Sequence, residues 1–252
     1  MAKARLRSQR TLISMIYVLL GWYSTASALP NIAFQNEPVK AQGTAFKIAD
    51  GIWMTAKHVA VDCVKMTIGN GDKPISVDRR VLHPETDIAL LLTQTSLGIS
   101  ALEIANKLPS VDEVGFLYGY PHNQPIDVKQ RFLGMRTLTL DRRRSVRIKV
   151  AFWSEIARNP RSAPVDLGGA SGGPVLNSKG AVVGLHVASI PRRGRTFSIS
   201  PESLSGFIEA QGQPINIHAI SLRPLDHAAP SWLVIGAELR AFEMVARVRC
   251  FL

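Results

Sequence analysis

The chain has 252 residues, of which 46% are hydrophobic and 19% are charged, and its formal net charge is +11. This balance excludes a disordered polymer and is typical of a globular protein. The length is sufficient for a domain with a substantial buried core.

The first 28 residues predict a signal peptide rather than part of the fold. An apolar stretch over 11–23 follows a basic start, and Ala26-Ser27-Ala28 fits the small-residue cleavage pattern. We therefore expect an exported protein, periplasmic or secreted after cleavage near Ala28, with its net charge reduced from +11 to +7. The alternative is an uncleaved membrane anchor, although the stretch is shorter than the roughly 20 residues that span a bilayer. The basic residues of the start are Lys3, Arg5, Arg7 and Arg10.

From Gly43 onward, short apolar runs alternate with turn residues, which predicts an all-β sandwich or barrel. The first two runs, 43–49 and 51–55, flank Asp50-Gly51, a pair favoured in β-hairpin turns. A linker is expected at 106–113. The further predicted strands are 64–68, 75–82, 87–92, 114–119, 128–140, 146–153, 173–176, 181–189 and 195–200.

A helix is predicted over 201–211, because Ser200 can cap it and Pro201 suits its first position. Beyond it, 215–222 is interpreted as a strand and 232–251 as an amphipathic helix. That second helix would carry Arg240, Arg247 and Arg249 on its polar side. The tail is expected to pack against the domain, and a regulatory or membrane-surface role is left open.

The candidate nucleophile is Ser171, which lies in the glycine-rich stretch 166–175. A serine hydroxyl needs a neighbouring base to take its proton and backbone N–H groups to hold the oxyanion that develops. Glycines on both sides allow the tight backbone curl that aims such groups at one point. A serine among glycines predicts only a turn, however, unless a base and its orienting acid are also present.

Both partners occur upstream. His58 ends the motif Thr55-Ala-Lys-His58, and Asp87 opens the apolar run 87–91. His58 would act as general base and Asp87 would orient its imidazole. Two other histidines are weaker candidates for the base, since His83 lies only four residues before Asp87 and His122 lies in a predicted loop.

These three motifs, in the order His58, Asp87, Ser171, resemble those of the chymotrypsin-fold (trypsin-like) serine proteases. The separation of 29 residues between His58 and Asp87, and the hairpin sequence over 173–184, resemble the bacterial HtrA-like branch. The resemblance covers roughly 41–210. It implies an exported serine endopeptidase that hydrolyses peptide bonds through an acyl-enzyme.

The resemblance also implies the fold, an all-β pair of six-stranded antiparallel β-barrels closed by a C-terminal helix. The first barrel would cover about 41–105 and the second about 114–200, so the protease domain would be 29–212. Residues 213–252 would form an extension of unknown role, too short for the PDZ domain that many HtrA-like proteins carry. The rival class is a protease-fold binding module whose site is gated or inactive.

By position in the family motif, the backbone N–H groups of Gly169 and Ser171 would form the oxyanion hole. In the pancreatic relatives an aspartate precedes the serine and pairs with a freed N-terminus. This chain has Ala170 there, so activation by that route is not expected.

The primary substrate pocket of the family would be walled here by residues 165–166 and 186–189. The six residues predicted to wall this pocket are Val165, Asp166, His186, Val187, Ala188 and Ser189. The run Gly184-Leu-His186 resembles glutamyl endopeptidases, in which the histidine binds an acidic or glutamine side chain. A preference for Glu or Gln over Lys or Arg follows. Two observations leave this open, since His186 could be an ordinary strand residue and Asp166 would repel an acidic side chain.

The predicted partner is a protein or peptide substrate, and neither a cofactor nor a metal is expected. Two basic clusters, at 142–149 and 192–195, could attract an anionic surface, although a solvated face explains them as well. Nucleic acid is not expected, because the chain is exported and has no recognisable binding module. Export would permit a disulfide between Cys63 and Cys250, and the oligomeric state is left open.

Overall fold

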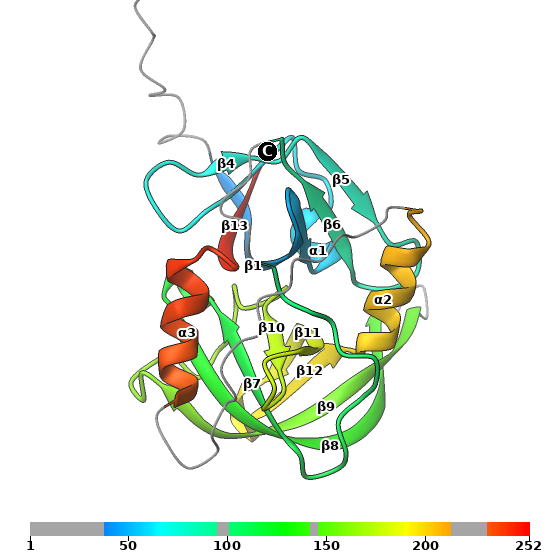
Figure 1. Ribbon diagram of the computed structural model, residues 1–252, viewed down its shortest axis with the longest axis vertical. Coiled ribbons are helices and arrows are strands. Elements are labelled where there is room, and N and C mark those ends of the chain that lie inside the picture. The colour runs from blue at the N-terminus through cyan, green and yellow to red at the C-terminus, as the bar shows by residue number, and fades with distance from the viewer. Residues whose placement is uncertain (1–37, 95–100, 142–145, 213–230) are drawn as a thin grey trace, which may run out of the picture. The chain divides into compact units, whose positions relative to one another are not determined.

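The computed structural model describes residues 38–94, 101–141, 146–212 and 231–252. The predicted signal peptide and the strand predicted over 215–222 lie outside these residues. The described residues form two antiparallel β-sheets with three helices, and none of those helices is long and apolar enough to cross a membrane. Both sheets can be followed in Figure 1.

The first sheet has seven strands in the order β4-β3-β13-β1-β2-β6-β5. The hairpin predicted around Asp50-Gly51 is confirmed, with Gly51 in the turn at a φ of +66° that favours glycine. The strands are β1 (Val39–Ala49), β2 (Ile52–Thr55), β3 (Lys65–Ile68), β4 (Ile75–Ser76), β5 (Arg79–Leu82), β6 (Ala89–Leu92) and β13 (Val245–Phe251).

The seventh strand, β13, corrects two predictions: a helix over 232–251 and six strands in the first barrel. Helix α3 (Ser231–Ala241) ends early, and Glu243 has a φ of +51° that a helix does not allow. From Val245 the chain pairs with β1 and β3 as a strand. In this segment buried side chains alternate with half-buried Arg247 and Arg249, which is the two-residue period of a strand.

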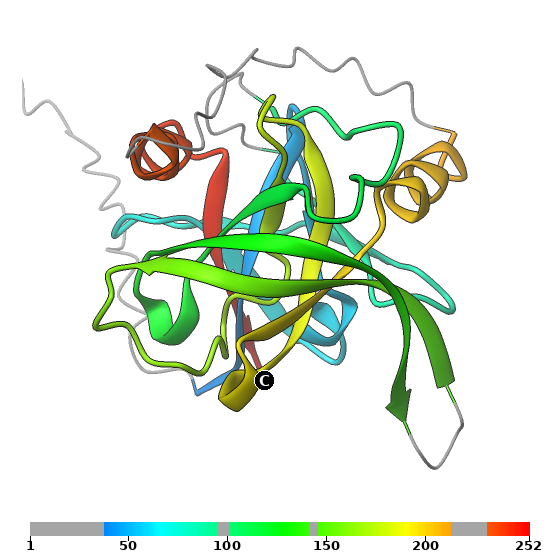
Figure 2. The same cartoon turned by 90° about the horizontal axis from the view of Figure 1, so that it is seen from below.

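The second sheet is a closed barrel of six strands in the order β10-β11-β12-β9-β8-β7, as predicted. Figure 2 shows the ends of β8 and β9 extending beyond the rest of this barrel. The strands are β7 (Val114–Gly119), β8 (Ile126–Asp141), β9 (Val146–Asn159), β10 (Pro174–Leu176), β11 (Val182–Ile190) and β12 (Arg195–Ile199). A mostly β chain with these two sheets confirms the chymotrypsin-like fold.

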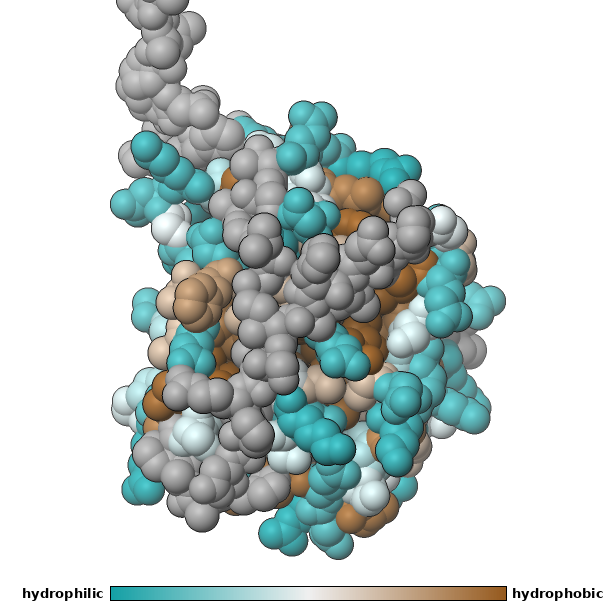
Figure 3. All heavy atoms as spheres, viewed as in Figure 1, coloured by the Kyte–Doolittle hydropathy of each residue, from teal (hydrophilic) through white to brown (hydrophobic). Residues whose placement is uncertain are grey.

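Apolar burial accounts for both sheets and for the helix that follows them. The buried apolar side chains form two clusters. Trp53 lies in the larger cluster and Trp153 in the smaller one, and both are fully buried. Helix α2 (Pro201–Glu209) begins after Ser200 as predicted, and the Ser200 hydroxyl accepts the Ser203 N–H. On the face seen in Figure 3, hydrophilic residues cover much of the described surface and hydrophobic residues show between them.

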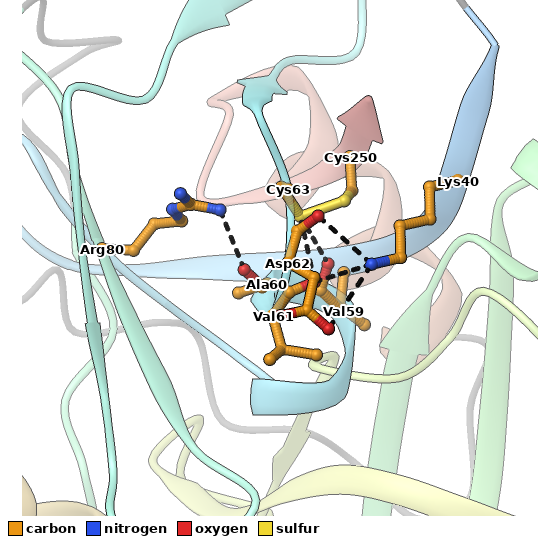
Figure 4. Close-up of a disulfide and its surroundings, with 8 residues drawn as sticks. All are labelled: Lys40, Val59, Ala60, Val61, Asp62, Cys63, Arg80 and Cys250. Carbon is orange, nitrogen blue, oxygen red and sulfur yellow. Dashed lines mark hydrogen bonds and ion pairs between the residues drawn. A yellow bond between two sulfur atoms is a disulfide. The ribbon is translucent and has the colours of Figure 1, made fainter. Parts of the chain in front are cut away.

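Cys63 and Cys250 form a disulfide, with their Cα atoms 5.3 Å apart (Figure 4). The bond joins β13 to the turn that follows α1 (Lys57–Ala60), the short helix that carries His58. Lys40 of β1 holds the same turn, because its Nζ donates to the Asp62 carbonyl at 3.2 Å. The C-terminal strand is thus fixed in the first sheet by hydrogen bonds and by a covalent link.

We predict that the double variant Cys63→Ala, Cys250→Ala loses about 2–4 kcal/mol of unfolding free energy, because the bond closes a loop of 187 residues in the unfolded chain. Urea unfolding of the variant and of the oxidised chain measures this. Reduction of the unmutated chain serves as the control and should shift the midpoint equally. Equal midpoints for oxidised and reduced chains would contradict the prediction.

Candidate active site

His58 and Asp87 meet because they lie at neighbouring strand ends. His58 is in α1, directly after β2, and Asp87 lies just before β6, which pairs with β2. The Asp87 carboxylate accepts two hydrogen bonds from His58: Oδ2 lies 2.7 Å from Nδ1, and Oδ1 lies 2.9 Å from the backbone nitrogen. The Asp87 side chain is 7% exposed and that of His58 is 50% exposed. The imidazole is therefore held through Nδ1, with half of its surface free.

The turn before Asp87 is held by His83 and Lys57. The Nδ1 atom of His83 accepts the N–H groups of Glu85 and Thr86 at 3.0 and 2.8 Å. Burial lowers the pKa of His83, which favours the neutral form that this acceptor role requires. Lys57 donates through Nζ to the His83 carbonyl at 2.6 Å. His83 thus shapes the turn, and Lys57, which the sequence analysis gave no role, ties that turn to α1.

Ser171 is brought to this junction by Gly172. A Cβ atom on Gly172 would lie 2.1 Å from the Thr44 carbonyl oxygen and 2.9 Å from the Ala56 nitrogen, so only glycine allows the approach. The Thr44 N–H also donates to the Ser171 carbonyl at 2.8 Å. The described residues contain no hydrogen bond from the Ser171 hydroxyl to His58, and such bonds are often long without substrate.

The two peptide groups that carry the predicted oxyanion-hole donors are both held by their carbonyl oxygens. The Gly168 carbonyl accepts the His122 N–H at 2.9 Å, and the Ala170 carbonyl accepts the Gly173 N–H at 2.9 Å. In a trans peptide the N–H points opposite to the C=O, so these bonds also fix the N–H groups of Gly169 and Ser171. Within the described residues neither N–H group has an acceptor.

Thr44 and Tyr120 support this loop, and the sequence analysis missed both. The fully buried Thr44 hydroxyl donates to the Gly169 carbonyl at 2.9 Å and accepts the Tyr120 N–H at 3.0 Å. A threonine in a strand carries no signal of such a role. His122, expected to be a loop residue, contributes its backbone N–H and has a φ of +48°.

The residues predicted to wall the substrate pocket differ in their exposure. Val165 is exposed and lines a groove of about 520 Å³ between β9 and the segment after β11, which none of the other five residues lines. Asp166 is also exposed, and its Oδ2 lies 3.6 Å from Nε2 of His122. On β11, His186 and Val187 are buried, whereas Ala188 and Ser189 are half-buried.

His186 is 1% exposed, and its Nδ1 atom has no hydrogen-bond partner among the described residues. Its pKa is lowered to about 3, chiefly by burial and also by the nearby charge of His58, against a hydrogen bond to the Phe197 backbone that raises it. The imidazole is therefore neutral at pH 7. Its backbone N–H donates to the Gly173 carbonyl at 2.9 Å, which places His186 directly behind the Ser171 loop.

Only part of the two basic clusters falls among the described residues, since residues 142–144 lie outside them. In the second cluster, Arg192 and Arg193 are exposed. Arg195 lies over the Phe152 ring, 5.9 Å from its centroid, and so contributes to packing. An anionic partner stays a prediction. No group of three or more His, Cys, Asp or Glu side chains in the described part of the chain is arranged to hold a metal ion.

Comparison with known proteins identifies the family. A family model described as a trypsin-like peptidase domain matches residues 43–185, more than half of the chain. The chain therefore belongs to the trypsin-like peptidase domain family and is a serine peptidase. A search of curated proteins gave no match.

Among solved structures, Rv3671c of M. tuberculosis is similar in fold. The inactive form of its serine-to-alanine mutant has 22% sequence identity and a TM-score of 0.56, over 69% of this chain and 84% of that one. The active form of the Rv3671c protease has 22% identity and a TM-score of 0.56, over 74% of this chain and 77% of that one.

We predict that acid destabilises the protein through His186. Its folded pKa of about 3 lies below the ordinary value of 6.5, so its contribution is complete above pH 6.5 and is lost as the pH falls toward 3. At about pH 4.5 this loss should amount to roughly 2–3 kcal/mol.

The measurement is urea unfolding of the unmutated chain and of His186→Gln, each at pH 7 and at about pH 4.5. The variant should lose less stability on acidification. The control is His122→Gln, which removes an exposed histidine and should follow the unmutated chain. Parallel losses in all three proteins would contradict the prediction.

Proposed function

We propose that this serine peptidase is an exported endopeptidase in which Ser171, His58 and Asp87 form the catalytic triad. The observation that carries the proposal is the pair of N–H groups on Gly169 and Ser171, which have no acceptor among the described residues and lie on peptides held by their own carbonyls. Donors that are already oriented stabilise a developing oxyanion without reorganisation at the moment of reaction. The doubly bonded Asp87–His58 pair supplies the oriented base.

The mechanism follows from these roles. Ser171 Oγ attacks the scissile carbonyl while Nε2 of His58 takes its proton, and the oxyanion accepts hydrogen bonds from the Gly169 and Ser171 N–H groups. His58 then gives the proton to the leaving amine, which leaves an acyl-enzyme on Ser171. Water, deprotonated by His58, hydrolyses the ester. Asp87 keeps Nδ1 of His58 protonated and stabilises the imidazolium.

Two features support export. The sequence of residues 1–28 has the three-part pattern of a signal peptide. The Cys63–Cys250 disulfide suits an oxidising compartment, where such bonds form and persist.

The proposal predicts that a fluorophosphonate probe labels the chain at Ser171. Ser171→Ala should abolish labelling, and His58→Ala should slow it strongly, because removing a triad member costs up to about a millionfold in kcat. Labelling is measured by fluorescence after electrophoresis, with peptide mapping of the adduct. A folded chain that is not labelled would favour the rival interpretation, a protease-fold binding module. Labelling that survives in Ser171→Ala would place the nucleophile elsewhere.

For the substrate, we propose that a Glu or Gln side chain precedes the cleaved bond. The support is His186, whose backbone N–H donates to the Gly173 carbonyl beside Ser171 and whose buried Nδ1 has no hydrogen-bond partner among the described residues. Because this imidazole is neutral at pH 7 and already donates to the Phe197 backbone, its Nδ1 is an acceptor that can take the N–H of a Gln amide, so Gln should be cleaved at least as well as Glu. A peptide library analysed by mass spectrometry tests the preference. Efficient cleavage after Arg, with none after Glu or Gln, would overturn it.

A further inference from the structure

The oxyanion loop lacks the ion pair that holds it in the pancreatic relatives, since the buried Ala170 precedes Ser171. The peptide that carries the Gly169 N–H depends instead on the His122 N–H, which donates to the Gly168 carbonyl. The contact is close, because a Cβ atom on Gly169 would lie 2.8 Å from the Tyr120 carbonyl oxygen. The position of the turn over 120–124 therefore sets the direction of the Gly169 N–H.

This turn connects β7 to β8 and contains the 3₁₀ segment η2 (Pro121–Asn123). Two hydrogen bonds close it, from the N–H of Asn123 to the Tyr120 carbonyl and from the N–H of Gln124 to the Pro121 carbonyl. His122 and Asn123 both have positive φ values, +48° and +63°, which few side chains adopt readily. Such a turn keeps its shape only where the structure on both sides holds it.

Helix α3 of the C-terminal segment holds both ends of the turn. On the β7 side, the Tyr118 hydroxyl donates to the Trp232 carbonyl at 2.9 Å. On the β8 side, the Arg240 guanidinium donates to the Ile126 carbonyl at 2.8 Å and to the Asp127 carboxylate. The Arg240 and Asp127 side chains are 14% and 5% exposed, so this ion pair is shielded from solvent.

The packing between α3 and β8 is tight. A Cβ atom on Gly236 would lie 2.5 Å from Oδ1 of Asp127, so the helix backbone packs directly against the carboxylate. Figure 1 shows α3 leading directly into β13, the strand that the first sheet holds.

The ring of Tyr120, at the start of the turn, lies between two cations of the same segment. The guanidinium carbons of Arg240 and Arg247 are 5.6 and 5.8 Å from its centroid. Arg247 itself is fixed, because it donates to the Asn70 carbonyl. These contacts add cation–π attraction to the hydrogen bonds at the ends of the turn.

We propose that the C-terminal segment α3–β13 keeps the oxyanion hole formed, with Arg240 as a positioning residue that acts through Tyr120 and the His122–Gly168 hydrogen bond. This inference deepens the proposed function and rests on it for its catalytic consequence. Its structural part, the coupling of α3 to the oxyanion loop, holds independently of activity.

The test compares the full chain with Arg240→Gln, its conservative partner Arg240→Lys, and Arg249→Gln as the matched control. Arg249 belongs to the same strand as Arg247 but has no described contact with Tyr120 or Asp127. Amide hydrogen exchange of the peptides covering 119–124 and 167–173 reports the coupling without any need for activity. Fluorophosphonate labelling rates and the kcat and KM for a cleaved peptide report its catalytic consequence.

We expect Arg240→Gln to speed exchange in both peptides and to lower kcat with KM changed by less than about threefold. The loss of kcat should be about 10- to 100-fold, below the roughly 100- to 1,000-fold of a removed oxyanion donor, because the donor is displaced and not removed. Arg240→Lys should recover most of both effects, and Arg249→Gln should show neither. If Arg240→Gln does not fold, Tyr118→Phe removes one hydroxyl at the other end of the turn and should speed exchange in the same two peptides.

Folded Arg240→Gln or Tyr118→Phe with unchanged exchange in 119–124 and 167–173 would overturn the inference. So would equal losses of kcat in Arg240→Gln and Arg249→Gln. If the unmutated chain is not labelled at all, the proposed function fails, whereas the exchange result still decides whether α3 is coupled to the loop.

Discussion

Thr44 is the constraint on which the site depends, because it joins the first sheet to the nucleophile loop of the second barrel. Its backbone N–H holds the Ser171 carbonyl, its hydroxyl holds the Gly169 carbonyl and the Tyr120 N–H, and its own carbonyl accepts the Thr55 hydroxyl at 2.7 Å. Thr44 is fully buried, so a lost partner would leave one of its polar atoms unpaired, at a cost of about 1–3 kcal/mol. The junction therefore behaves as one unit.

Backbone hydrogen bonds fix the two peptides that carry the proposed oxyanion donors. The Gly168 and Ala170 carbonyls are held by N–H donors, which also fixes the N–H groups of Gly169 and Ser171. The Asp87 carboxylate is buried, and each of its oxygens accepts one hydrogen bond from His58. These backbone hydrogen bonds explain why the loop keeps its shape although the uncharged Ala170 precedes Ser171.

The sequence predicted the features that depend on a few neighbouring residues and their chemistry. Three kinds of feature could be recognised in the sequence, because each depends on a few adjacent residues. They are the motifs around His58, Asp87 and Ser171, the hairpin at Asp50-Gly51 and the cap of α2. The roles of Thr44 and His122 depend on contacts between distant backbone groups, which leave no mark on residue type. The helix predicted over 232–251 ends at Ala241, and from Val245 onward pairing with two distant strands decided the conformation of that short apolar and basic run.

The proposed mechanism depends on an oxyanion hole that is already formed in the free protein. The most direct test is a crystal structure of the chain with a phosphonate bound to Ser171, compared with one of the free chain. A preformed oxyanion hole should place a phosphonyl oxygen about 2.7–3.1 Å from the nitrogens of both Gly169 and Ser171. The hydrogen bond from His122 to the Gly168 carbonyl should also be the same in both structures. A Gly168–Gly169 peptide that is reversed in the free chain, or that turns only on binding, would contradict the claim.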